Sequence, residues 1–160
     1  MVGTLNILIA EDDPNDTFLL ARAFSKAAVQ APLHFVRDGQ EVVDYLQGQN
    51  PFADRDAHPL PALLLLDLKM PRLDGFEVLQ WVRRQEGLRR LLVVVFSSSS
   101  QIEDINRAYD LGANSYLGKP AASEDLFELV KSLEQYWLKH NLHPDCRSAR
   151  LPVSSALSRV

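Results

Sequence analysis

The chain has 160 residues, of which 46% are hydrophobic and 24% are charged, as in an ordinary soluble globular protein with a single core. The formal net charge of −4 argues against a general nucleic-acid surface or a surface for anionic membranes. No apolar run approaches the roughly 20 residues needed to cross a bilayer, so no membrane partner is expected.

The first residues of the sequence and its cysteine content suggest a cytoplasmic setting. Met1-Val2-Gly3-Thr4 leads directly into a strand-like run without the basic region of a signal peptide. The single Cys146 cannot form an internal disulfide, which fits a reducing compartment. The four histidines are scattered and form no zinc-binding spacing.

Hydrophobic patterning predicts strands and helices in strict alternation. Strands are expected at residues 5–10, 33–37, 63–66, 91–96 and 114–118. Helices are expected to begin after the capping residues Asp13, Asp38, Asp74, Ser100 and Ser123. Five strands alternating with five helices predict a doubly wound α/β fold with a parallel sheet, although alternation alone does not fix the strand order.

Two segments depart from this alternation. Residues 48–61 form a turn-rich loop, longer than most connections in a compact domain, which suggests mobility or a contact surface. From residue 141 the helical pattern stops, and prolines and serines predict a flexible tail with little capacity to pack. We therefore expect one domain at residues 1–140 and a tail at 141–160.

The stretch Leu63-Leu64-Leu65-Leu66-Asp67 is central to the prediction. An apolar run without alternation is typical of a strand buried on both faces, and Pro61 and Pro71 limit it to the length of a strand. Asp67 then lies at the carboxyl end of a strand, the edge where open α/β sheets bind ligands. The alternative is an aspartate that simply starts a turn.

Polar side chains follow four of the predicted strands. They are Glu11 and Asp12, Asp67, Ser97, and Lys119. Three carboxylates in one crevice repel one another and need a cation or shifted pKa values, and hard oxygen ligands suit Mg²⁺. A cation, an ammonium and a hydroxyl around one carboxylate are what an aspartyl phosphate requires. Each residue alone could equally be a cap, a turn residue or a solvated lysine.

At this point the sequence resembles the receiver domain of two-component response regulators, over residues 5 to 140. The resemblance rests on four motifs in order: Ile-Leu-Ile-Ala-Glu11-Asp12-Asp13; Leu-Leu-Leu-Leu-Asp67-Leu-Lys-Met-Pro71-Arg-Leu-Asp74-Gly75; Val-Val-Val-Phe-Ser97-Ser98; and Gly112-Ala113-Asn-Ser-Tyr116-Leu-Gly-Lys119-Pro120. It implies a flavodoxin-like sheet with strand order 2-1-3-4-5.

The resemblance also implies roles for individual residues. Asp67 would be the phosphoacceptor. Asp12, Asp67 and the backbone carbonyl of Lys69 would hold Mg²⁺, with Glu11 reaching it through water. A second group of residues would bind the phosphoryl group or act in the switch: Ser97, Ser98 and Lys119 near the phosphoryl group, Tyr116 as an aromatic switch that moves inward, and Pro120 following a cis peptide bond. Lys69 and Ser99 occupy positions where the family tunes the lifetime of the phosphoaspartate.

A narrower resemblance links the chain to the small response regulators that partner bacterial and cyanobacterial phytochromes. It rests on the long loop before the third strand and on the ending Ser-Leu-Glu-Gln-Tyr136-Trp137-Leu-Lys-His140. It implies a light-sensing histidine kinase as partner and a homodimer through the fourth helix, fifth strand and fifth helix. Tyr136 and Trp137 could belong to such a surface or could equally cover the edge of the core.

These observations predict a stand-alone response regulator that accepts a phosphoryl group from a histidine kinase and signals through protein contacts; it is not expected to be an enzyme. An adaptor that keeps the fold but needs no phosphate is the main alternative. A phosphohydrolase would need a general acid two residues after Asp67, where Lys69 is a poor candidate. Binding to nucleic acid is not expected.

Overall fold

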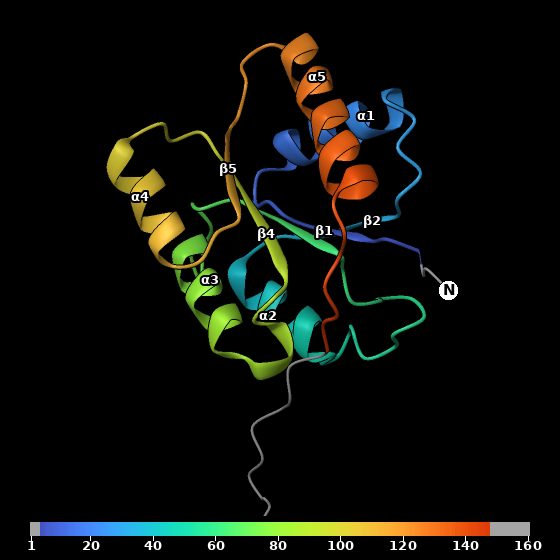
Figure 1. The fold of residues 1–160 in the computed structure, drawn as a ribbon, viewed down its shortest axis with the longest axis vertical. Helices are drawn as coiled ribbons and strands as arrows, with labels where there is room; N and C mark the ends of the chain where they lie inside the picture. Colours follow the sequence, from blue (N-terminus) through green and yellow to red (C-terminus); the bar gives the residue numbers. More distant parts are fainter. Residues whose placement is uncertain (1–3, 148–160) are drawn as a thin grey trace, which may run out of the picture.

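The computed structural model describes residues 4–147, which form a five-stranded parallel sheet with helices on both faces (Figure 1). The strand order is β2-β1-β3-β4-β5, as the resemblance implied. The strands are β1 (Ile7–Ala10), β2 (Leu33–Val36), β3 (Leu63–Leu66), β4 (Leu92–Ser97) and β5 (Ser115–Gly118). The helices are α1 (Pro14–Lys26), α2 (Gly39–Gln47), α3 (Gly75–Arg84), α4 (Ile102–Asp110) and α5 (Ser123–Leu133).

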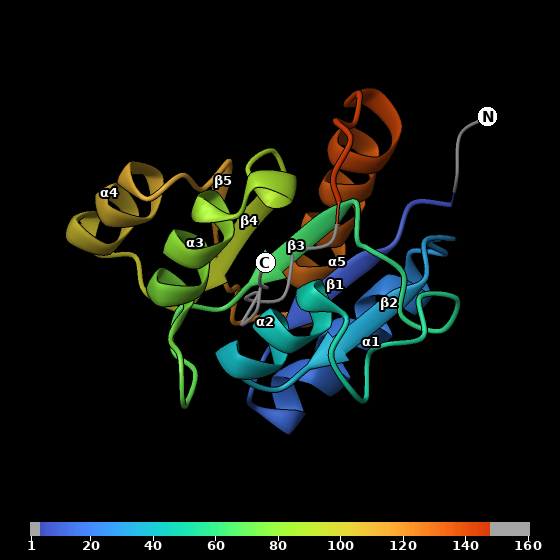
Figure 2. The same cartoon turned by 90° about the horizontal axis from the view of Figure 1, so that it is seen from below.

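The sheet separates two hydrophobic clusters, one under each layer of helices. α1 and α5 cover one face, and α2, α3 and α4 lie on the other (Figures 1 and 2). Successive leucines of β3 alternate between the two clusters: Leu63 and Leu65 pack toward α1 and α5, and Leu64 and Leu66 toward α2 and α3. All four are buried, which explains the unbroken apolar run.

Three of the predicted helix caps are present. The Asp13 carboxylate accepts a hydrogen bond from Asn15 N at 2.8 Å, and Pro14 is the first residue of α1. The Asp38 carboxylate caps α2 by accepting from Glu41 N at 2.8 Å. Asp74 forms a full capping box with the residue three positions on, Glu77.

The two predicted serine caps are wrong. The capping residue of α4 is Gln101 rather than Ser100, and that of α5 is Ala122 rather than Ser123; neither makes a side-chain capping bond in the described structure. At α4 the hydroxyl of Ser99 takes over part of this role, because it accepts from Gln101 N at 3.3 Å and donates to the Asp104 carboxylate at 2.6 Å.

The long loop between α2 and β3 is tied to α2 by Arg55. Its guanidinium donates to the carbonyls of Tyr45 and Leu46 at the end of α2, at 2.8 and 3.0 Å. The rings of Phe52 and His58 pack against the Tyr45 ring, at centroid distances of 5.2 and 5.7 Å. These contacts satisfy exposed helix carbonyls and hold the loop against the domain.

The segment after α5 packs more than we expected. α5 continues as a π-helix at Glu134–His140, and residues 141–147 then run back toward the end of α3 (Figure 1). Arg147 N donates to the Gly87 carbonyl at 2.8 Å, and Cys146 packs against the hydrophobic cluster under α2 and α3. The rest of the predicted tail, residues 148–160, lies outside the described residues. In residues 4–147 no helix is long and apolar enough to cross a membrane.

Candidate functional site

Three carboxylates meet at the carboxyl ends of β1 and β3. The register pairs Ala10 with Leu66, so the residues that follow these strands lie side by side. One carboxylate oxygen each from Glu11, Asp12 and Asp67 lies within 4.8 Å of the others. Glu11 and Asp67 are buried, whereas Asp12 is exposed. The predicted strand ends alone place these three residues together.

Lys119 joins the carboxylates from the end of β5. Its Nζ lies 2.6 Å from Glu11 Oε1 and 3.1 Å from Asp67 Oδ2. It also lies 3.2 Å from a carboxylate that the sequence analysis did not single out, Asp16 Oδ2 in the first turn of α1. The backbone holds Lys119 in place, because Lys119 N donates to the Ser97 carbonyl at 2.8 Å.

Burial and the closeness of the carboxylates to one another disfavour negative charge on the oxygens of this site. Burial raises the pKa of Glu11 to about 7, and the nearby Asp67 carboxylate adds to this rise, while hydrogen bonding to Lys119 opposes it. Burial alone would lower the pKa of Lys119, but the carboxylates of Glu11 and Asp67 outweigh it and hold that pKa above its usual range. A further cation near these oxygens would relieve their repulsion.

The donor set fits a hard divalent cation. It offers three carboxylate oxygens from Glu11, Asp12 and Asp67, the ligand type that Mg²⁺ and Mn²⁺ share. Lys69, the predicted carbonyl ligand, lies beside them, and its backbone N donates to Asp67 Oδ1 at 3.4 Å. Asp12 and Lys69 line an open cleft of about 540 Å³, which gives water and a phosphate room to enter.

The predicted switch residues meet in the loop between β4 and α4. Ser97 is buried, and its Oγ accepts a hydrogen bond from Ser99 N at 3.1 Å. The Tyr116 hydroxyl donates to the Ser99 carbonyl at 2.8 Å. Ser98 is exposed on the same loop. Ser99 therefore links the predicted phosphoryl-binding hydroxyl to the predicted aromatic switch, with Asp104 holding the Ser99 side chain at 2.6 Å.

The expected cis peptide bond before Pro120 is not present. Within residues 4–147 the cis bond lies at Asn50–Pro51, and the Lys119–Pro120 bond is trans. The cis and trans forms of an X–Pro bond differ in free energy by only about 0.5–1 kcal/mol. The Lys-Pro dipeptide alone therefore does not determine which form is present, and the surrounding fold does.

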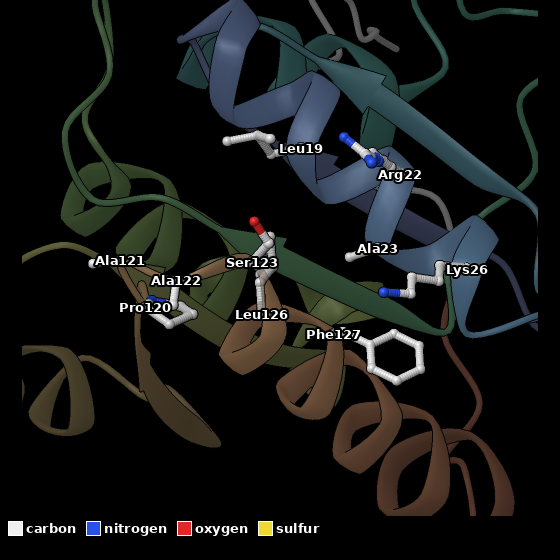
Figure 3. A pocket seen from close by; sticks show the side chains of 10 residues that line it. All are labelled: Leu19, Arg22, Ala23, Lys26, Pro120, Ala121, Ala122, Ser123, Leu126 and Phe127. Carbon is white, nitrogen blue, oxygen red and sulfur yellow. The ribbon is translucent and has the colours of Figure 1, made fainter.

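A small groove begins directly beside the site. Pro120 and Ala121 form one end of a cavity of about 100 Å³ between α1 and α5, with the basic side chains Arg22 and Lys26 on its α1 side (Figure 3). Phe127 on α5 lies opposite, with Lys26 Nζ 5.0 Å from the centre of its ring. This cavity is therefore lined mainly by apolar side chains of the two helices, together with two basic side chains of α1.

Two polar residues of this region, Asp16 and Asp104, were not predicted from the sequence. Both lie in the first turn of a helix, where an acidic residue is normally explained by the helix dipole. Their spacing from the strand ends carries no signal, since each reaches the site only after its helix packs on the sheet.

Comparison with known proteins identifies the family. A family model described as the response regulator receiver domain matches residues 7–131. The chain belongs to this family. A probable methanogenesis regulatory protein, FilR2 of Methanothrix harundinacea, is 38% identical over 138 residues, covering 86% of each chain. Response regulator Rcp1 of Synechocystis is 35% identical over 133 residues, covering 83% of this chain and 88% of Rcp1.

Two solved response regulators share the receiver fold and also have clear sequence similarity to this chain. Response regulator RPA3017, described in red light signalling of R. palustris, is 42% identical with a TM-score of 0.83, covering 88% of this chain and 98% of its own. The Mn²⁺-bound form of Rcp1 is 34% identical with a TM-score of 0.78, covering 88% of this chain and 99% of its own. The chain is thus a two-component signalling protein whose relatives include a cyanobacterial phytochrome response regulator, RcpA. Its three clustered carboxylates could hold a divalent cation.

Proposed function

We propose that this receiver domain takes a phosphoryl group from the phosphohistidine of a sensor kinase onto Asp67. One observation carries this proposal: the Lys119 ammonium lies 3.1 Å from the Asp67 carboxylate, with the oxygens of Glu11 and Asp12 alongside. Lone acids at strand ends have many explanations, but an ammonium and two further carboxylates around one aspartate suit the chemistry of an aspartyl phosphate.

The transfer is a nucleophilic displacement at phosphorus. An Asp67 Oδ atom forms a bond to phosphorus while the bond from phosphorus to the histidine nitrogen breaks, and the imidazole leaves with that electron pair. The Lys119 ammonium and the Ser97 hydroxyl stabilise charge on the phosphoryl oxygens. A bound divalent cation supplies further neutralisation of the same oxygens.

We propose Mg²⁺ as that cation, held by Asp12 and Asp67, by the carbonyl of Lys69, and by Glu11 through water. Oxygen donors of this kind suit Mg²⁺, which keeps several waters and accepts phosphate oxygens as ligands. The similar protein Rcp1 has been solved with Mn²⁺, an ion with the same preference for oxygen ligands.

The output is a change in a protein-binding surface rather than turnover of a substrate. Phosphorylation adds about −1.5 to −2 charge beside the Ser97 hydroxyl. A turn of Ser97 toward the phosphate breaks its bond from Ser99 N, the same residue whose carbonyl accepts from Tyr116. We propose that this connection repacks the surface of α4 and β5.

A phytochrome kinase is the partner that we propose, acting in the cytoplasm. The support is similarity to RPA3017, described in red light signalling, and to RcpA, described as a cyanobacterial phytochrome response regulator. FilR2 is a similar protein described in methanogenesis regulation, so the input signal needs its own test. Incubating the protein with a phosphorylated phytochrome kinase and with an unrelated histidine kinase would decide: faster transfer from the unrelated kinase would contradict the assignment.

The same resemblance supports a homodimer through α4, β5 and α5. A groove of about 540 Å³ runs between β5 and α5, and Tyr136 beside it is 54% exposed and packs edge-on against Trp137. Light scattering of the wild type and of Tyr136→Ser tests this surface. A monomeric wild type at high micromolar concentration would refute the dimer.

The phosphoryl transfer itself is tested by intact-mass analysis after incubation with phosphoramidate. We expect one added phosphoryl group on the wild type with Mg²⁺, and none on Asp67→Asn or when Mg²⁺ is chelated. Asp74→Asn is the matched control, because Asp74 lies in the same cleft but caps α3. If no adduct appears and beryllofluoride also fails to bind, the phosphate-independent adaptor is the better assignment.

A further inference from the structure

Every N–H donor of Lys119 Nζ already has a carboxylate partner. An ammonium has three donors, and Glu11, Asp67 and Asp16 lie 2.6, 3.1 and 3.2 Å from this nitrogen. No donor remains for a phosphoryl oxygen in this arrangement. Lys119 must therefore release one carboxylate before it can contact a phosphoryl group on Asp67.

The three partners differ in how easily they can be released. The Glu11 side chain is 2% exposed, and leaving it without its ammonium would strand a buried carboxylate. Asp67 is the acceptor itself. The Asp16 side chain is 37% exposed and lies in the first turn of α1, where water and the helix N-terminus can stabilise its charge. Asp16 is the partner that costs least to give up.

We propose that Asp16 is a positioning residue that holds Lys119 in the resting state and restrains phosphorylation of Asp67. The inference rests on the proposed phosphoryl transfer and adds a residue to that same site. In the resting protein Asp16 occupies the Lys119 donor that a phosphoryl oxygen needs. In the phosphorylated protein its negative charge remains near the phosphoryl oxygens and opposes them.

Removing that charge should therefore favour the phosphorylated form. Asp16→Asn keeps the shape of the side chain, and we expect beryllofluoride to bind about two- to fivefold more tightly and phosphoramidate to react faster by a similar factor. The assay uses saturating Mg²⁺, because losing a carboxylate also weakens attraction for the cation. The gain should shrink in 1 M salt, where exposed charges are screened.

Two variants separate this role from a general charge effect or a folding effect. Glu124→Gln makes the same change in net charge on the exposed first turn of α5 and should behave as wild type. Asp16→Glu restores the charge and should return beryllofluoride affinity to the wild-type value. Thermal unfolding of Asp16→Asn reports the loss of the favourable helix-dipole interaction separately.

The possible outcomes distinguish this inference from the proposed function. If wild type is phosphorylated and Asp16→Asn shows unchanged beryllofluoride affinity and unchanged rate, Asp16 is only a surface ion pair and the inference is wrong. If Glu124→Gln gives the same gain, the effect is net charge and the inference is also wrong. If wild type takes no phosphoryl group at all, the proposed function fails and the role of Asp16 fails with it.

Discussion

The hydrogen bond from the Tyr116 hydroxyl to the Ser99 carbonyl should set how firmly the loop between β4 and α4 is held. The bond is 2.8 Å long and partly buried, so its loss in Tyr116→Phe should cost about 1 kcal/mol of unfolding free energy. The same energy would shift a two-state loop equilibrium about fivefold toward the released form. Urea denaturation and amide chemical shifts of residues 97–101 measure the two effects.

A double-mutant cycle tests whether the bond acts through Ser99. Ser99→Ala removes the hydroxyl that Asp104 holds at 2.6 Å but keeps the carbonyl that accepts from Tyr116. Since both bonds fix the same residue, we expect a coupling energy of about 0.5–1 kcal/mol. Additive losses, or a Tyr116→Phe variant with wild-type stability and unchanged loop amides, would refute the argument that Ser99 links Tyr116 to Ser97.

Four further changes test other parts of the fold and the site. Arg83→Lys replaces five guanidinium N–H donors with three ammonium donors. The five donors bind the carbonyls of three residues and the side chain of a fourth, so urea denaturation should show a loss of about 2–3 kcal/mol. Gly75→Ala places a Cβ against the Asp67 carbonyl, so phosphorylation should slow and stability should fall by about 1–3 kcal/mol, measured by intact mass and thermal unfolding. Gly118→Ala meets no described atom within 4 Å and should stabilise the protein by about 0.5–1 kcal/mol in urea denaturation. The pKa of Glu11 is about 7 in the fold against 4.5 for the free side chain, so between these pH values the folded state keeps a proton that the unfolded state loses. The unfolding free energy of the metal-free protein should therefore fall by up to about 3 kcal/mol as the pH rises from 4.5 to 7. Glu11→Gln should remove this pH dependence in thermal melts.

The sheet and the acidic site could be predicted because their signals are local in the sequence. An apolar run followed by an acid marks both a buried strand and its carboxyl end, so Asp67 is placed by its own neighbours. Parallel strands then bring such ends together at one edge, which is how Glu11, Asp12 and Lys119 come to lie around it. Leu63 and Leu64 pack on opposite faces of the sheet, as the apolar run without alternation already predicted.

Side chains that bind backbone carbonyls of distant segments could not be predicted in this way. Arg83 at the end of α3 donates to the Gly112 carbonyl at 2.6 and 2.9 Å, and so fixes the turn before β5, 29 residues away in sequence. Arg55 does the same for the end of α2. A guanidinium has no preferred sequence distance to a carbonyl, and its pattern in the chain is that of any surface arginine.

The serine caps fail for a related reason. The Ser-x-x-Glu pattern at Ser100 is a valid capping box, yet the hydroxyl one residue earlier bonds both Gln101 N and Asp104 and fixes the start of α4. That earlier position also carries the carbonyl bound by Tyr116, so tertiary contacts on β5 decide where the loop ends and the helix begins. The same competition explains why Asp16 was not predicted, because its local role in α1 is complete in the sequence. In the sheet β3 and β4 separate β1 from β5, and only the folded arrangement brings Lys119, after β5, within 3.2 Å of Asp16. Residues with a sufficient local explanation are therefore where further functional roles should be sought in this fold.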